Sequence, residues 1–313
     1  MKSASLTDDA RRARSGRIAA LAFDYAAQPV QAAESCNLCE YSQFVVLTHR
    51  DRYGYPASAI GCRRCGLVFL DPRMTADGYK RFYVDVYRPL VSAYHGRQID
   101  AVTIQDEQRD YARERGDLLH PFVRAAGCRS LLDIGGSTGV VAHEWTTRFG
   151  LKGTVIDPSP LEIEQAQRLN LETVTAIVED WDAGGRTFDM VVMCQTVDHL
   201  LDITRTLDAV RMVVRPDGLF FVDIVDFRAA FLRNWSVEEA VKIDHPYYLT
   251  EATMEAYLRR SGFEVLRVDY AADHLHVGYV CRLGGTDRGS LPAPSTVEAL
   301  WRDIRFVQNA PRP

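Results

Sequence analysis

Short apolar runs alternate with amphipathic stretches through the second half of the chain. The runs typical of strands are SLLDIG (130–135), KGTVID (152–157), ETVTA (172–176), FDMVVMC (188–194), GLFFVDIV (218–225), FEVLRVDY (263–270) and HVGYVCRL (276–283). The helices between them are expected to begin near Val140, Pro160, Asp198 and Glu251. This alternation predicts βαβ units and a parallel sheet with helices on both faces. The last two strands are close enough in sequence to pair antiparallel at one edge.

The rest of the chain has a different pattern. Residues 1–33 are expected to form a helix and a tether, and residues 34–74 contain the strand-like runs FVVLTHR and LVFLDPR. Residues 75–127 have apolar positions at three- and four-residue spacing, which predicts helices. The doubly wound domain would then occupy residues 128–284. Residues 285–313 would form a loose tail with a short helix.

Composition narrows the class of protein. The chain has 313 residues, of which 47% are hydrophobic and 25% charged, enough apolar material for one large core and a smaller unit. The net charge of −5 gives no overall electrostatic reason to expect nucleic acid or an anionic membrane as partner. We find neither the apolar segment of a signal peptide nor a run long enough to span a membrane. A cytoplasmic location is therefore expected, and the oligomeric state is open.

Four of the seven cysteines form two pairs with metal-ligand spacing. Cys36 and Cys39 form one C-x-x-C pair, and Cys62 and Cys65 form another after 22 intervening residues. Two thiolates on one tight turn can bind the same ion, and two such turns complete a tetrahedral zinc site. Because protein fills all four positions, the predicted zinc is structural. The strand-like runs around the pairs indicate a zinc ribbon.

The segment DIGGSTG, residues 133–139, follows the first predicted strand of the doubly wound domain. Ligands of such sheets bind beyond the carboxyl ends of the strands, where Gly135, Gly136 and Gly139 allow close approach and tight packing. The Lys-Ser/Thr ending of a phosphate-binding loop is absent, and the glycine spacing differs from a dinucleotide fingerprint. Asp133, just before the glycines, would repel pyrophosphate but suits a cationic or zwitterionic ligand.

Further acids extend this site. Asp157 ends the next strand, 24 residues after Asp133, where a ribose is commonly bound through its hydroxyls. The next strand region leads to Glu179, Asp180 and Trp181, which offer acceptors for an amino group and an aromatic cover for a flat ring. An amino-acid end, a ribose and an adenine together describe S-adenosylmethionine.

Residues 129–282 resemble the class I S-adenosylmethionine-dependent methyltransferases. LLDIGGSTG is similar to their first motif, VIDPSP to the second, FDMVVMCQTVDHLLD to the fourth, and VVRPDGLFFVDI to the following strand. The resemblance implies a Rossmann-like, seven-stranded α/β fold, the cofactor S-adenosylmethionine, and a further cofactor contact at Gln195. Ser137 departs from the family, in which many members have glycine at this position.

A second resemblance covers the lead-in to this domain. CRRCGLVFLDPRMTADGYKRFY is similar to the zinc-ribbon region of bacterial methyltransferases that modify sugars or related small metabolites, including the deoxysugar C-methyltransferases. In that group a zinc domain and a helical segment cap the cofactor and build the acceptor pocket. The chain lacks their long C-terminal domain, so their exact substrate is not carried over.

His199, in QTVDHLLD, is the candidate general base. It follows the fourth strand, its unperturbed pKa lies near neutrality, and it aligns with the histidine of the deoxysugar C-methyltransferase motif. Asp198 would orient His199 or lie on the cofactor side. The alternative is that His199 has a structural or supporting role.

The segment KIDHPYYLT offers candidate acceptor contacts. His245, Tyr247 and Tyr248 would line a sugar pocket by stacking and hydroxyl contacts, or else pack as a helix-capping loop. Tyr83, Tyr87 and Tyr94 are expected on one helical side, as a core stripe or a lid. The neighbouring Arg88 would meet a substrate phosphate.

Three functions fit these features. The leading one is methyl transfer to a small molecule, most simply a sugar or nucleotide-linked sugar of a polysaccharide or natural-product pathway. The first alternative is a ribosomal-RNA-type methyltransferase with a zinc-ribbon RNA-binding module, which the acidic balance disfavours. The second is a non-catalytic protein that binds S-adenosylmethionine.

Overall fold

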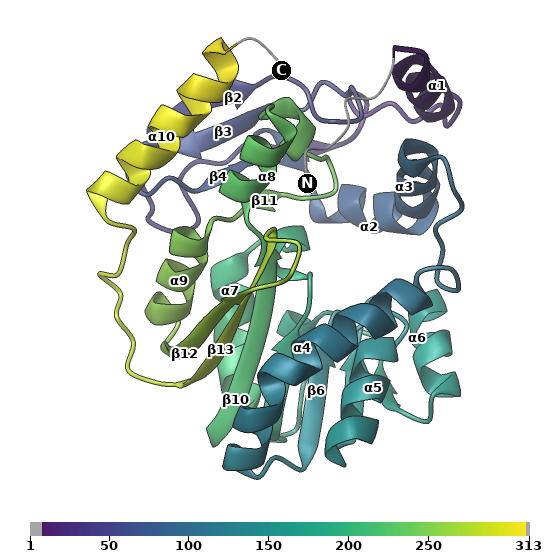
Figure 1. The fold of residues 1–313 in the computed structure, drawn as a ribbon, viewed down its shortest axis with the longest axis vertical. Coiled ribbons are helices and arrows are strands. Elements are labelled where there is room, and N and C mark those ends of the chain that lie inside the picture. The colour runs from purple at the N-terminus through teal and green to yellow at the C-terminus, as the bar shows by residue number, and fades with distance from the viewer. Residues whose placement is uncertain (1–7, 311–313) are drawn as a thin grey trace. The chain divides into compact units, whose positions relative to one another are not determined.

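The computed structural model describes residues 8–310 of the chain. The ends of the predicted N-terminal segment and C-terminal tail, residues 1–7 and 311–313, lie outside the described residues. The chain forms two compact units that interleave in sequence (Figure 1). The first comprises the described residues of Met1–Asp100, Asp226–Thr253 and Leu291–Pro313, and the second comprises Ala101–Val225 and Met254–Ser290.

The second unit is built on a seven-stranded sheet of order β12-β13-β10-β9-β6-β7-β8. Its strands are β6 (Ser130–Ile134), β7 (Lys152–Ile156), β8 (Glu172–Val174), β9 (Phe188–Met193), β10 (Val214–Val225), β12 (Phe263–Tyr270) and β13 (His276–Leu283). Strands β8, β7, β6, β9 and β10 are parallel, while β13 pairs antiparallel with both β10 and β12. All seven strands expected from the sequence are present, and the α/β fold class is confirmed, as is the antiparallel pair at one edge.

The helices of this unit are α4 (Gln105–Ala126), α5 (Val140–Phe149), α6 (Pro160–Arg168), α7 (Ile203–Val213) and α9 (Glu251–Arg260), the last of which starts at the boundary with the first unit. Apolar residues of α4, α5 and α6 share one core with the sheet, centred on the fully buried Trp145, and Figure 1 shows α4 and α5 in front of the strands. Helix α7 packs against β9.

One predicted helix begins later than expected. Residues Val197–His199 form a single 3₁₀ turn, and α7 starts only at Ile203. Asp202 caps α7 by accepting a hydrogen bond from the backbone amide of Arg205 at 3.1 Å. An N-cap residue has extended backbone angles, so the chain between the turn and the helix is not helical. The expectation of a helix from Asp198 is wrong by five residues.

The first unit contains a four-stranded antiparallel sheet of order β11-β4-β3-β2. Its strands are β2 (Phe44–Thr48), β3 (Ala59–Cys62), β4 (Val68–Leu70) and β11 (Tyr247–Tyr248), and a separate pair joins β1 (Val30–Gln31) to β5 (Arg73–Met74). Its helices are α1 (Asp8–Ala19), α2 (Ala76–Asp85), α3 (Tyr87–His95), α8 (Phe227–Asn234), the 3₁₀ turn η3 (Glu238–Ala240) and α10 (Pro294–Asn309).

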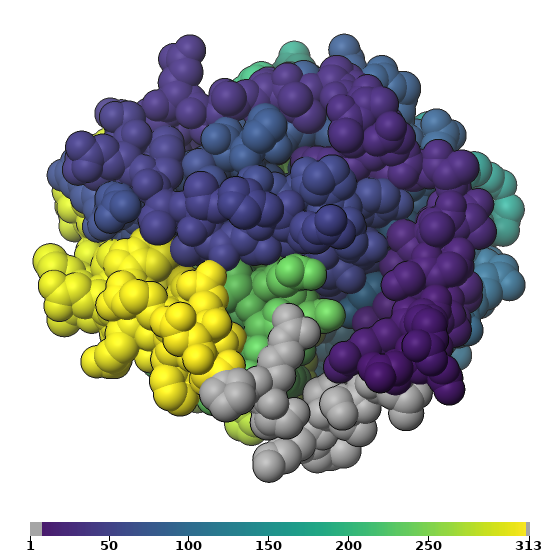
Figure 2. Space-filling view, turned by 90° about the horizontal axis from the view of Figure 1, so that it is seen from above, coloured from purple at the N-terminus to yellow at the C-terminus, as the bar shows by residue number. Residues whose placement is uncertain are grey.

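Helix α10 is longer than the short terminal helix expected, and it packs on the β2–β4 region that the sequence predicts to be a zinc ribbon. Its buried residues recur at helical spacing: Val297, Leu300, Ile304 and Val307. A Cβ placed on Gly66 would lie 3.3 Å from Leu300, and one on Gly61 would lie 2.3 Å from the Trp301 ring. In the space-filling view of Figure 2, α10 (yellow) lies against the segment of the predicted zinc ribbon (blue) and against the segment around α8 (green).

The compact units divide the chain differently from the five segments expected from the sequence, which remain a prediction. Helix α4, expected in the cap, belongs to the second unit because its buried Leu119 and Val123 pack in the sheet core. The segment Asp226–Thr253 joins the first unit, where β11 extends the ribbon sheet through its pairing with β4. Both changes follow from contacts between residues far apart in sequence.

The tyrosine stripe falls on two helices. The chain leaves α2 at Val86 and re-enters helical geometry in α3, so Tyr83 and Tyr94 do not share one continuous helix. The rings of Tyr83 and Tyr87 meet edge to face at 5.3 Å, whereas Tyr94 meets Tyr53 at 5.3 Å. The expectation of a single helical side is therefore wrong.

Among the described helices, none combines the length and the apolar character that crossing a bilayer requires.

Candidate cofactor and metal sites

Asp133 lies near the carboxyl end of β6, just before the glycine loop, and β6 lies between the parallel strands β7 and β9. It is 1% exposed, and within residues 8–310 neither carboxyl oxygen has a hydrogen-bond partner. Burial, and then the nearby Asp157, raise the pKa of Asp133 to about 7. A buried carboxyl without a partner is costly, so this position fits a ligand that donates hydrogen bonds or carries positive charge.

The glycine loop covers this carboxyl closely. A Cβ on Gly136 would lie 2.7 Å from the Asp133 carboxyl group, closer than real contacts allow. Gly139, with φ of 75°, is the N-cap of α5, and a Cβ there would meet Ala166 at 2.7 Å. The two glycines therefore serve close approach at one position and helix packing at the other.

Asp157 holds the same loop from the end of β7. Its carboxylate accepts the backbone amide of Ser137 at 3.0 Å and that of Ser159 at 2.8 Å. Ser137 also donates its hydroxyl to Glu162 at 2.9 Å. The serine that departs from the family pattern thus links the loop to α6. Asp157 remains near the loop surface, at 8% exposure.

The remaining predicted cofactor residues lie in the same unit. Gln195 is exposed, has φ of 50°, and follows β9 at the carboxyl edge of the sheet. Glu179 accepts a hydrogen bond from the Thr206 hydroxyl of α7. Asp180 pairs with Arg205 at 3.1 Å, and Trp181 is half-buried beside Phe188. The side chains of Glu179 and Asp180 are therefore engaged with α7, and that of Trp181 is not.

The predicted base lies just beyond Gln195. Asp198 and His199 belong to the 3₁₀ turn after β9, and the His199 amide donates to the Thr196 carbonyl at 3.0 Å. Asp198 is 4% exposed, whereas His199 is half-buried. Both residues follow the same strand end as the cofactor residues, as expected. Their roles remain predictions.

The four predicted zinc ligands converge in the first unit. Their sulfur atoms all lie within 4.8 Å of one another, with Cys36 and Cys65 at 3.5 Å and Cys39 and Cys62 at 3.5 Å. All four residues are buried, and none forms a disulfide. This donor set fits a tetrahedral zinc ion.

The two C-x-x-C turns have the same backbone hydrogen bonds. In the first turn, the amide of Glu40 donates to the carbonyl of Cys36 at 2.8 Å. In the second turn, the amide of Gly66 donates to the carbonyl of Cys62 at 2.9 Å. Glu40 and Gly66 both have positive φ, of 60° and 77°. Identical turns that aim their thiols at one point are what a shared metal ion requires.

The predicted acceptor residues belong to the first unit. The Nζ of Lys242 lies 2.9 Å from Nε2 of His245, which lies 3.4 Å from the Asp244 carboxylate. The Tyr248 hydroxyl donates to the Lys242 carbonyl at 2.6 Å and accepts the Lys242 amide at 2.9 Å. This placement favours a role for Tyr248 in holding the loop. Arg88 lies on α3, with its guanidinium carbon 5.5 Å from the Tyr87 ring centre.

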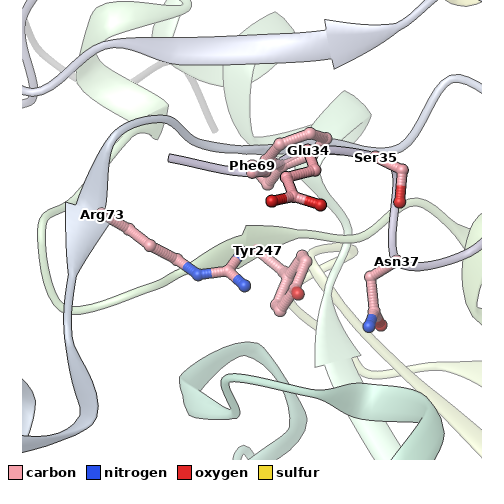
Figure 3. A pocket seen from close by; sticks show the side chains of 7 residues that line it. Glu34, Ser35, Asn37, Phe69, Arg73 and Tyr247 are labelled. Carbon is pink, nitrogen blue, oxygen red and sulfur yellow. The ribbon is translucent and has the colours of Figure 1, made fainter. Parts of the chain in front are cut away.

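Tyr247 lines a small cavity of about 200 Å³ within the first unit (Figure 3). The guanidinium of Arg73 stands 5.0 Å from the centre of its ring, and Phe69 borders the same space. Figure 3 shows the Tyr247 ring between the side chains of Arg73 and Asn37, with the Glu34 carboxylate above it. Such a volume is below that of a typical drug-sized ligand pocket.

Several residues around the cofactor loop were missed from the sequence. Gln108 on α4 accepts the hydroxyl of the fully buried Thr138 at 2.6 Å, and Tyr111 on the same helix donates to Asp223 at 2.8 Å. The signal was available in part, because polar Gln108, Tyr111 and Arg115 recur at helical spacing on the face of α4 that contacts the sheet. In the first unit, Lys242 and Asp244 were likewise not singled out.

Comparison with known proteins gives three findings. A family model described as a methyltransferase domain matches residues 105–268. A ubiquinone biosynthesis O-methyltransferase of Methylocella silvestris is 33% identical over 97 residues, which cover 29% of this chain and 38% of that protein. One from Methylobacterium sp. (strain 4-46) is 29% identical over 126 residues, covering 34% and 50%. The chain thus spans at most about half the length of these two relatives.

Among solved structures, the mitomycin 7-O-methyltransferase MmcR has a TM-score of 0.51 and 18% identity, over 66% of this chain and 60% of that one. Likeness at this level concerns the fold alone.

Proposed function

Because the chain belongs to the methyltransferase domain family, we propose that it transfers a methyl group from S-adenosylmethionine to a small-molecule acceptor. The observation that carries this proposal is the buried, unpartnered carboxyl of Asp133 beneath Gly136. A cationic or hydrogen-bond-donating ligand is what would compensate such a group. The acid at Asp157, on the neighbouring strand end, supports the same ligand.

The residues present fit this cofactor. Asp133 and Gly136 would accept its amino-acid end, Asp157 its ribose hydroxyls, and the region of Glu179 and Trp181 its adenine. Gln195 would contact it from the end of β9. When bound, the cofactor supplies a methyl group on a sulfonium ion, and the protein's task is to align the acceptor and exclude side reactions.

His199 is our candidate for removing a proton from the acceptor. Its half-buried imidazole follows the same strand end as Gln195, and histidine is the side chain most often used as a general base. Asp198, nearly buried next to it in the chain, would orient the imidazole. A hydroxyl or a carbon acid requires this step, whereas a neutral amine does not.

The acceptor class has two candidates. The zinc ribbon and the loop of His245 and Tyr247 favour a sugar or nucleotide-linked sugar, on the resemblance stated for the sequence. A phenolic hydroxyl is the second candidate, because the curated relatives are O-methyltransferases of ubiquinone biosynthesis. In either case the zinc ion held by the cysteine cluster would be structural.

The test uses the full chain and radiolabelled S-adenosylmethionine with three acceptor pools: nucleotide sugars, catechol-type phenols and ribosomal RNA. We expect label in one of the two small-molecule pools and none in RNA. Label in RNA alone would replace the proposal with RNA methylation. If wild type and His199→Ala both bind the cofactor and neither transfers label to any pool, a non-catalytic protein is favoured.

A further inference from the structure

A buried acid outside the predicted site holds the loop that follows β9. Asp223 lies in the middle of the sheet on β10 and is 0% exposed. One carboxylate oxygen accepts the backbone amide of Gln195 at 2.8 Å, and the other accepts the Tyr111 hydroxyl at 2.8 Å. Each oxygen therefore has a defined partner, one on the loop and one on α4.

Arg115 supplies the opposite charge. Its Nε lies 3.7 Å from the Asp223 carboxylate, and its side chain is 2% exposed. The guanidinium also donates to the backbone carbonyl of His276 on β13 at 3.1 Å. Burying two charges in a sheet core removes more favourable solvation than burying a hydrophobic pair would. A contribution to stability is therefore a weak explanation for this arrangement.

Gln195, whose amide donates to Asp223, has a strained backbone conformation. Gln195 has φ of 50°, in the left-handed region that non-glycine residues rarely adopt. The next residue, Thr196, lies against the glycine loop, since a Cβ on Gly135 would come within 2.5 Å of its side chain. The position of this loop therefore sets the space available above Gly135.

We propose that Asp223 is a positioning residue for cofactor binding, which holds Gln195 and Thr196 against Gly135 with help from Tyr111 and Arg115. The inference rests on the proposed function, because it assumes that S-adenosylmethionine binds at this loop. Asp223 touches neither the reacting atoms nor the cofactor in this role. It acts by fixing one backbone amide.

The experiment measures cofactor binding, which needs no knowledge of the acceptor. In Asp223→Asn the side chain keeps its shape but can no longer accept from both Gln195 and Tyr111. We expect affinity for S-adenosylhomocysteine, measured by calorimetry at a temperature where the variant is folded, to fall about 10-fold, which corresponds to about 1.4 kcal/mol.

Asp189→Asn is the matched control. Asp189 lies at the opposite end of β9, where its carboxylate accepts the amides of Arg129 and Ser130 at 3.0 Å each. This control should lower the melting temperature while leaving the dissociation constant unchanged. A purely structural role for Asp223 predicts the same result for Asp223→Asn, namely lower stability with unaltered affinity.

Tyr111→Phe decides the matter if Asp223→Asn does not fold, because it removes only the hydroxyl that donates to Asp223. We expect it to weaken binding in the same direction. Unchanged affinity in the folded variants, with normal binding by the wild type, would overturn the inference and leave the proposed function intact. A wild type that binds neither S-adenosylmethionine nor S-adenosylhomocysteine would overturn both.

Discussion

The cysteine cluster and the glycine loop are both built on tight turns with positive φ, but they treat their polar groups in opposite ways. In the cluster, the two turns repeat the same backbone hydrogen bonds and aim four sulfur atoms at one another. In the loop, Asp133 is buried with no partner for either oxygen among the residues that the structure describes. The first site is closed on itself, whereas the second is completed only by a ligand.

This difference has an energetic meaning. Metal bound by four protein ligands contributes directly to the free energy of folding. A buried carboxyl without a partner lowers the free energy of unfolding, and so destabilises the fold, until a ligand compensates it. The same chain therefore contains one site that would stabilise the fold and another whose buried carboxyl costs stability unless a ligand binds.

Removing zinc should have the largest effect. We expect one zinc ion per chain by elemental analysis, and Cys36→Ser or Cys62→Ser should each remove it. Structural zinc is worth about 10–16 kcal/mol in small zinc-binding peptides, so metal-free protein should lose the folded ribbon. Trp301, which packs against Gly61 of the ribbon, should report the loss by fluorescence.

Cys128→Ser is the control for the zinc experiment, because this cysteine lies outside the cluster and is half-buried. It should retain zinc and the ribbon signal. A wild type that contains no zinc, with four reactive thiols in the native state, would show that the cluster is not a metal site.

Replacing Asp133 should move stability and binding in opposite directions. Its pKa in the folded protein is raised to about 7, from an ordinary value of about 3.9. The cost of ionising it is therefore absent below about pH 4 and develops as the pH rises to about 7. Asp133→Asn removes this cost, so in the absence of ligand it should raise the free energy of unfolding at pH 8 by roughly 1–4 kcal/mol and change little at pH 4.

The same variant should bind S-adenosylmethionine more weakly, since it lacks the charge that compensates the ligand. Chemical denaturation at the two pH values measures the first effect, and calorimetry measures the second. Because burial also raises the pKa of Asp51 to about 7, the wild-type pH dependence alone does not isolate Asp133; the difference between variant and wild type does. Equal stability at pH 8 would contradict the account of Asp133 as a costly buried acid.

Local patterns were enough to predict the strands of the sheet and the convergence of the four cysteines. The strands of the second unit are short apolar runs, and the residues from Asp133 to Gly139 are contiguous. The local sequence is therefore enough to locate both the strands and the glycine loop. The late start of α7 depends on the capping side chain of Asp202, which a periodicity pattern does not detect. The break at Val86 is likewise invisible in the spacing of apolar residues.

Other features depend on contacts over long sequence separations. Tyr111 and Asp223 are 112 residues apart, and β11 joins β4 across a still longer stretch of sequence. Asp223 is an acid within an apolar strand run, but its partners are identified only when the neighbouring strand end and α4 are placed around it. The interleaving of the two units could not be predicted for the same reason.

The smallest effect expected in this comparison of the two sites concerns Asp157, which belongs to both sides of the contrast. Its carboxylate already accepts the amides of Ser137 and Ser159, yet we also expect it to bind the ribose hydroxyls of the cofactor. Asp157→Ala should weaken binding of S-adenosylhomocysteine by about 1–3 kcal/mol, the usual worth of charge-assisted hydrogen bonds. Loss of the loop contacts alone would give a similar number, so the size of the effect does not identify its cause. Cofactor analogues that lack the 2′- or 3′-hydroxyl separate the two. If Asp157 binds the ribose, at least one analogue should bind the wild type more weakly than the parent compound but bind Asp157→Ala equally well, because the partner of the missing hydroxyl is already gone. If the analogues lose the same affinity in both proteins, Asp157 serves only to hold the glycine loop, and the ribose is bound elsewhere.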